Sequence, residues 1–187
     1  FGSATYLHIL GRTLLIGAVA TVVALIMGYP IAFTMAKGPR GLQKWLLLIV
    51  VSPLLVVVVV RTFGWILLLG LDGPVNRLLL ATGLVAQPVK ILFNHLGIII
   101  GLVHVYLPFM ILPVATALER IDPAVEDAAV TLGATPAALI RRVLVPLSLP
   151  GVAAGSVLVF TLSVSAYVTP ALLGGAGYRV IPTFVAQ

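Results

Sequence analysis

Cysteine is absent from the sequence, so disulfides and thiolate metal sites are excluded. Charge is also scarce. Asp, Glu, Lys and Arg make up 9% of the 187 residues, against about 25% in an average soluble domain. Hydrophobic residues account for 61% of the chain, and its mean hydropathy is +1.22. This composition excludes an ordinary soluble domain and predicts a protein of the lipid bilayer.

Acidic residues are few and unevenly placed. Four of the five lie within residues 119–127 and the fifth is Asp72, so the long apolar runs contain no carboxylate. They also contain no His-Glu-x-x-His motif, which argues against an intramembrane enzyme. An ion-coupled transporter or channel usually has intramembrane carboxylates or inverted repeats, and neither is visible. Because no Gly-x-x-x-x-Gly-Lys-Ser/Thr loop occurs, ATP hydrolysis for any transport must come from a separate subunit.

Four apolar runs are long enough to cross a membrane, since a spanning helix needs about 20 residues. Runs such as Leu46–Val51 do not alternate apolar and polar residues, as the strands of a membrane barrel would. We therefore predict an all-α, polytopic membrane protein with about four transmembrane helices. Pro146 and Pro150 predict that the last run begins with a loop or helix entry, and Pro53 and Pro108 predict helix kinks. The runs are Thr13–Ala36, Trp45–Leu71 with Arg61 inside it, Ile91–Leu118 and Val143–Tyr178.

The orientation of the chain follows from Lys and Arg in its connections. Residues 36–44 and 119–150 together carry six, and the connections on the opposite side carry four. We therefore place the first two segments in the cytoplasm, and we place residues 72–90, residues 174–183 and both chain ends outside. The net charge of +6 comes from these loop cations. It indicates contact with membrane lipids rather than with nucleic acid, because no basic cluster is interleaved with aromatic residues.

The two ends of the sequence predict a fragment. There is no initiator Met, and an apolar stretch begins near Gln187. Residues 1–11 lack the basic region and cleavage site of a signal peptide. We expect a single transmembrane domain over residues 1–187, truncated at both ends, with a cytoplasmic loop over about residues 119–150.

The segment after residue 120 has strong signals for two short helices. Asp122-Pro123 is a helix start, because Asp caps the first turn and Pro suits the first helical position. Gly133 predicts the end of this helix. Thr135-Pro136 repeats the start signal, and Pro146 is expected to stop the second helix.

The first of these short helices has a distinct apolar face. It comprises Val125, Ala128, Ala129 and Leu132, which follow the helical spacing i, i+3, i+4 and i+7. Two interpretations of the loop are open: an amphipathic connector packed on its own bundle, or a docking site for another protein.

A spaced signature in this loop resembles that of a known family. Asp127-Ala128-Ala129 is followed by three residues and Gly133, and then by nine residues and Val143-Leu144-Val145-Pro146. This resembles the EAA motif of the permease subunits of binding-protein-dependent ABC importers, with Asp127 in place of Glu and Glu126 beside it. In that family the loop is a coupling helix seated in a groove of the ATPase subunit. The resemblance implies this coupling role for Glu126, Asp127, Ala128, Ala129, Leu132 and Gly133, and leaves open which acid makes the contact.

Five further motifs are similar to the spermidine/putrescine-type branch of the family. The resemblance implies a type I importer permease with a core of six spans, of which this fragment would lack the first and last. The motifs are Gly28-Tyr29-Pro30-Ile31-Ala32, Arg61-Thr62-Phe63-Gly64-Trp65, Leu107-Pro108-Phe109-Met110, Leu147-Ser148-Leu149-Pro150-Gly151 and Leu172-Leu173-Gly174-Gly175.

The function implied by this resemblance is transport across the bacterial inner membrane by alternating access. The implied partners are ABC ATPase subunits, a second permease subunit (the same chain or a different one), and a periplasmic or lipid-anchored solute-binding protein. No cofactor is implied. A polyamine such as spermidine or putrescine is the expected solute, while iron(III), thiosulfate or phosphonate, or a structural subunit without transport, are the alternatives.

Arg61 is the one cation inside an apolar run. A cation at the bilayer centre costs about 2.5–3.5 kcal/mol on insertion scales, so such residues usually face protein or water. We predict a translocation path formed by Arg61, Trp65 and Tyr106. The alternative is that Arg61 snorkels to the interface and that the aromatic residues are interfacial anchors. The three histidines, His8, His95 and His104, lack the spacing of a metal or catalytic site.

Overall fold

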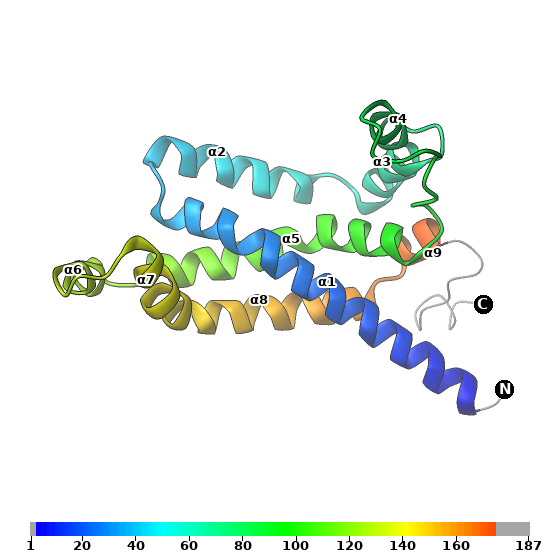
Figure 1. Ribbon diagram of the computed structural model, residues 1–187. Helices are drawn as coiled ribbons and strands as arrows, with labels where there is room; N and C mark the ends of the chain where they lie inside the picture. Colours follow the sequence, from blue (N-terminus) through cyan, green and yellow to red (C-terminus); the bar gives the residue numbers. More distant parts are fainter. Residues whose placement is uncertain (1–2, 175–187) are drawn as a thin grey trace. The chain divides into compact units, whose positions relative to one another are not determined.

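The computed structural model describes residues 3–174, and within that range the chain is helical and contains no strand (Figure 1). Most of the predicted external segment 174–183 lies outside the described residues. A short 3₁₀ turn occupies Ser52–Leu55 and a π-helical turn occupies Ile140–Leu144. The α-helices are α1 (Ser3–Lys37), α2 (Arg40–Val51), α3 (Val58–Leu69), α4 (Pro74–Ala81), α5 (His95–Glu119), α6 (Pro123–Thr131), α7 (Pro136–Leu139), α8 (Val145–Ser165) and α9 (Val168–Gly174).

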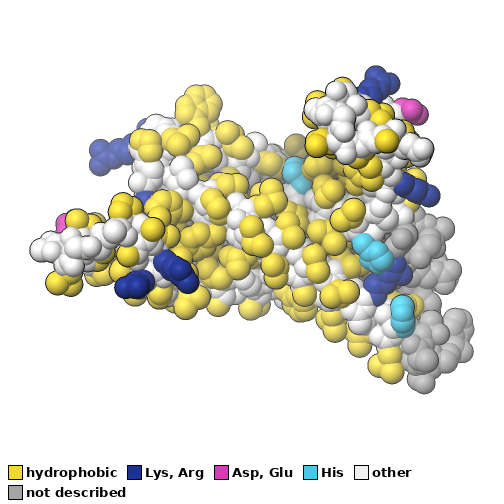
Figure 2. All heavy atoms as spheres, viewed as in Figure 1, with side chains coloured by type: hydrophobic (Ala, Val, Ile, Leu, Met, Phe, Trp, Pro, Cys, Tyr) yellow, Lys and Arg dark blue, Asp and Glu magenta, His cyan; other side chains and the backbone are white. Residues whose placement is uncertain are grey.

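Within residues 3–174, four helical stretches have the length and composition to cross a membrane, which confirms the predicted fold class. They are Leu7–Lys37, Val58–Ala81, His95–Glu119 and Pro136–Ser165. Figure 2 shows hydrophobic side chains over most of the visible helix surface. Such a surface suits lipid, since a soluble monomer rarely exposes large contiguous apolar areas.

The prediction of one helix across Trp45–Leu71 was wrong. Helix α2 ends at Val51, the 3₁₀ turn follows, and α3 begins only at Val58. Pro53 lies in this turn, where its missing N–H removes a hydrogen bond that a continuous helix would need. Arg61 therefore lies in the first turn of a new helix and not in the middle of a continuous one.

The prediction that Pro146 stops the second helix of the loop was also wrong. The chain stays helical from Pro136 to Ser165, through α7, the π turn and α8. The Val145 N–H bonds to the carbonyl of Ile140, five residues back. This shift in hydrogen-bond register lies immediately before Pro146, and π bulges of this kind let a helix absorb a local irregularity.

The described residues form two compact units, the first built from residues 3–21, 54–106 and 160–174. In the first unit α3 packs against α4 and α9, and Gly101 of α5 lies close to Leu173 and Thr169 of α9. Asn76 of α4 is fully buried. Its side-chain amide donates to the carbonyls of Gly70 and Val89 and accepts from the Val89 N–H, at 2.8–3.0 Å. Through these hydrogen bonds, Asn76 holds Gly70 and Val89 close to α4 in the segment that connects α3 with α5.

The second unit comprises residues 22–53 and 107–159. Its core lies where α5 meets α8 and the second half of α1. Gly151 and Gly155 of α8 lie against α5, at Pro113 and Met110 respectively, and Gly28 of α1 also lies against Met110. The hydroxyls of Tyr29 and Ser148 are 3.0 Å apart and share a hydrogen bond. This unit also contains the predicted coupling loop.

Candidate coupling site

The local start and end signals of α6 act as the sequence predicts. The side chain of Asp122 accepts a hydrogen bond from the Ala124 N–H at 2.9 Å, and Pro123 occupies the first helical position. Gly133 follows the last turn with a φ of +84°, a left-handed conformation that glycine adopts without steric cost. The Thr135 hydroxyl then caps α7 by accepting from the Ala138 N–H at 3.3 Å. These contacts confirm the two helix starts and the glycine elbow between them.

Helix α6 has no buried residue. Leu132, at its end, is 88% exposed, and Asp127 and Ala128 are also exposed. Val125 lines an open groove of about 790 Å³ beside residues of α5 and α8. The apolar face of α6 is therefore accessible on this chain, and the helix is not part of a packed core.

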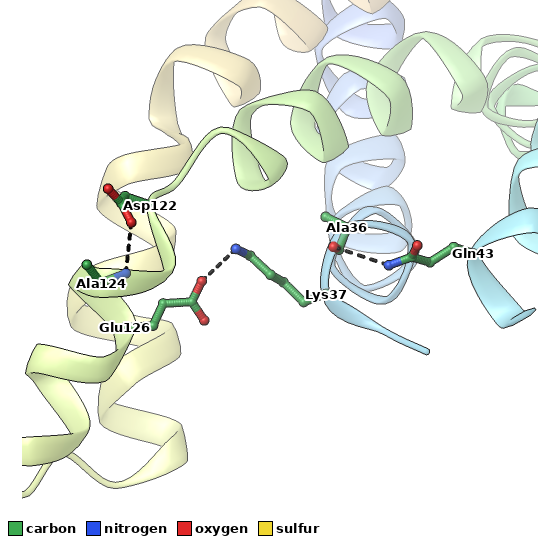
Figure 3. A network of polar contacts seen from close by, with 6 residues as sticks. All are labelled: Ala36, Lys37, Gln43, Asp122, Ala124 and Glu126. Carbon is green, nitrogen blue, oxygen red and sulfur yellow. Dashed lines mark hydrogen bonds and ion pairs between the residues drawn. The ribbon is translucent and has the colours of Figure 1, made fainter. Parts of the chain in front are cut away.

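Glu126 differs from its exposed neighbour Asp127. A carboxylate oxygen of Glu126 lies 2.5 Å from Lys37 Nζ, and 19% and 23% of the Lys37 and Glu126 side chains are exposed (Figure 3). Lys37 is at the end of α1, 89 residues away in sequence. This ion pair was not predictable from the sequence, because no local pattern connects positions so far apart.

The predicted translocation residues gather in the first unit. Arg61 and Trp65 lie one helical turn apart on α3, and the Trp65 ring meets the His104 ring of α5 edge-on, with centroids 5.3 Å apart. The Arg61 charge is within electrostatic range of His104 and Tyr106. The Nε and Nη1 atoms of Arg61 and Nδ1 of His104 are buried and have no hydrogen-bond partner among the described residues. The sequence did not predict that His104 lies against Trp65.

His95, another histidine of the first unit, contacts Arg12. His95 Nε2 accepts a hydrogen bond from Arg12 Nε at 2.8 Å. Throughout the described part of the chain, no three His, Asp or Glu side chains are grouped as metal ligands would be.

Comparison with known proteins identifies the class of this helical membrane protein. The family described as "Binding-protein-dependent transport system inner membrane component" matches residues 18–185. The chain belongs to this family of inner-membrane transport permeases.

Several individual permeases are similar to the chain. The spermidine/putrescine transport system permease protein PotB of Haemophilus influenzae is 37% identical over 171 residues, which cover 91% of this chain and 60% of PotB. PotB of Escherichia coli K12 is 33% identical, with 91% and 62% covered. The inner membrane ABC transporter permease protein YdcU of E. coli K12 is 35% identical over 194 residues, with 96% and 61% covered. The chain thus spans about three fifths of the length of these relatives.

Proposed function

We propose that this chain is part of the transmembrane permease subunit of an ABC importer, which moves a small solute across the inner membrane. The observation that carries the proposal is the exposed, doubly capped loop with the EAA spacing. A capped helix without buried residues gains little from its own chain, whereas its exposed apolar face suits a groove on another protein.

In the proposed complex, the ATPase groove receives α6. Ala128 and Ala129 allow close approach, Leu132 offers an apolar contact, and Gly133 sets the angle between α6 and α7. Asp127 is exposed and supplies negative charge to the groove, while Glu126 is paired with Lys37. ATP binding shifts the permease only if the ATPase dimer binds one permease conformation more tightly than the other, so that the difference in affinity drives alternating access.

We infer that the solute is a polyamine, because two of the relatives above are named as spermidine/putrescine permeases. Outside residues 119–127, the chain has one acidic residue, Asp72. The complementary negative charge for a polyamine therefore comes largely from outside these 187 residues, that is, from the rest of the permease, the second permease subunit and the solute-binding protein. Iron(III), thiosulfate and phosphonate are the alternative solutes.

The proposal is tested by expressing the full-length permease with an ABC ATPase and a solute-binding protein encoded beside it, and reconstituting them in vesicles. We expect the ATPase to co-purify. We also expect putrescine-loaded binding protein to stimulate ATP hydrolysis and putrescine uptake. Stimulation by another solute, without putrescine uptake, would replace the polyamine with that solute. Failure of the ATPase to co-purify would favour a structural subunit.

The predicted topology can be tested by labelling single cysteines in this cysteine-free chain with an impermeant reagent. Gly41→Cys and Ala137→Cys are expected to be protected in intact cells, and Gln87→Cys to be labelled from outside. All three sites are exposed, so the reagent can reach them on the side of the membrane where they lie. Labelling of Ala137→Cys from outside, with Gln87→Cys protected, would invert the topology.

A role for Arg61 in the translocation path predicts that Arg61→Leu changes transport without impairing membrane insertion. Loss of a charge from a membrane span makes insertion easier, while loss of the Arg61 charge, which acts electrostatically on His104 and Tyr106, changes the polarity of the path. We expect a several-fold change in uptake rate or solute preference at normal expression. Arg77→Leu, the same change at an exposed site, is the control. Identical uptake in both variants would leave Arg61 as a structural or snorkelling residue.

A further inference from the structure

Helix α6 has no buried residues, so packing in a core does not fix its position. Other contacts must do so. The capping contact of Asp122 is local to the helix, and so is the hydrogen bond from the Thr131 hydroxyl to the Asp127 carbonyl. Among the described residues, the ion pair of Glu126 with Lys37 joins α6 to the long helix α1. The orientation of α6 relative to α1 therefore depends strongly on this pair.

The two charges are placed where each helix stabilises them. Lys37 lies in the last turn of α1, near the negative end of that helix dipole, and Glu126 lies in the first turn of α6, near the positive end. Both side chains are about four-fifths buried. Screening by water and salt is weaker for such a pair than for an exposed one, so the contact persists at physiological ionic strength.

The α1 side of the contact is itself held in place (Figure 3). The Gln43 side-chain amide of α2 donates to the carbonyls of Gly38, at 2.9 Å, and Ala36, at 3.4 Å. The turn is tight at Gly38, where an added Cβ would lie 2.3 Å from the Thr34 carbonyl oxygen. The end of α1 that carries Lys37 is therefore held by the turn between α1 and α2. Movement of Glu126 away from Lys37 would have to break the ion pair or distort this turn.

We propose that Lys37 and Glu126 are positioning residues that hold α6 in register with α1, so that displacement of α6 by an ATPase reaches this span directly. The two adjacent acids then have separate tasks. Glu126 forms the ion pair with Lys37 inside the chain, while Asp127 is exposed and can contact the ATPase. The proposal rests on the proposed coupling function of α6, and it adds a route into the membrane helices other than the continuous chain of α7 and α8.

Charge reversal tests the proposal in the reconstituted full-length transporter. Lys37→Glu and Glu126→Lys each place like charges together, and each is expected to lower the stimulation of ATP hydrolysis by loaded binding protein several-fold. The double variant restores opposite charges and should return the stimulation to within about twofold of wild type. Lys44→Glu is the control, because Lys44 is exposed on α2 and undergoes the same charge change. The ratio of stimulated to basal hydrolysis is compared at equal complex stoichiometry and equal melting temperature.

A reversible covalent link tests the same contact within a single sample, even if the charge variants fold poorly. Lys37→Cys/Glu126→Cys introduces the only thiols of the described chain and can be bridged by a short bis-methanethiosulfonate. The bridged transporter is expected to show stimulated hydrolysis, and dithiothreitol should remove most of that stimulation. Lys44→Cys/Glu126→Cys, treated identically, should not respond to either reagent.

These outcomes separate the inference from the proposed function. A wild-type complex without ATPase binding or stimulation would overturn the function itself. Normal wild-type behaviour, together with unchanged stimulation in both single charge variants or in the unbridged cysteine pair, would overturn the positioning role. Loss of stimulation in both single variants without recovery in the double variant would also overturn the pair as the operative contact.

Discussion

Gly133→Val is expected to abolish coupling to the ATPase while the membrane helices remain folded. Gly133 has a φ of +84°, and a β-branched residue in that region costs about 1 kcal/mol or more. No neighbouring atom lies within 4 Å of an added Cβ, so the strain is in the backbone rather than in packing. The chain can relieve it by changing the angle between α6 and α7, which would misalign the docking face.

The measurement combines expression, ATPase co-purification and stimulated hydrolysis. We expect normal expression, weak ATPase binding or unstimulated hydrolysis, and little uptake. Gly41→Val is a matched control, since Gly41 also has open space around its Cβ position but lies in α2 without a positive φ. Normal stimulation in Gly133→Val would remove the coupling role from this elbow. Loss of expression would instead show that Gly133 is required for folding.

Gly151→Val is expected to destabilise the packed membrane helices themselves, unlike Gly133→Val, which should leave them folded. A Cβ at this position of α8 would lie 2.5 Å from the Ala117 Cβ and 2.6 Å from the Pro113 carbonyl oxygen of α5. The backbone oxygen cannot move aside without shifting the helix. Overpacking of a close contact costs about 1–3 kcal/mol, sometimes more, and membrane helices depend on such small residues for close association.

The expected result for Gly151→Val is a large loss of monodisperse protein in detergent and a lower melting temperature. Ala153→Val, two residues away on an exposed part of α8, adds a similar side chain and should behave as wild type. Equal melting temperatures for the two variants would show that α5 and α8 can separate at this point without loss of stability.

The local signals of the proposed coupling loop were predictable because each depends on a few adjacent residues. Asp122 and Thr135 cap their helices through nearby backbone N–H groups, and Gly133 adopts the conformation that glycine favours at a helix end. Long apolar runs likewise predict spanning helices without reference to tertiary contacts.

Other features were not predictable from local patterns. The break after Val51 and the continuous helix through Pro146 both concern prolines, and composition alone does not decide whether a proline ends a helix or is absorbed by it. The Lys37–Glu126 pair joins residues 89 positions apart, and the Trp65–His104 contact joins two different helices. These depend on how the helices pack, which hydropathy does not encode.

The buried Asn76 has a consequence for where the chain between α3 and α5 can lie. Loops usually stay at the aqueous surface because water must satisfy their peptide groups. Here one amide side chain satisfies the carbonyls of Gly70 and Val89 and the N–H of Val89. The Asn76 side chain replaces the water molecules that would otherwise bond to these three backbone groups. The two ends of the connection can therefore approach the lipid headgroups without leaving the groups unpaired.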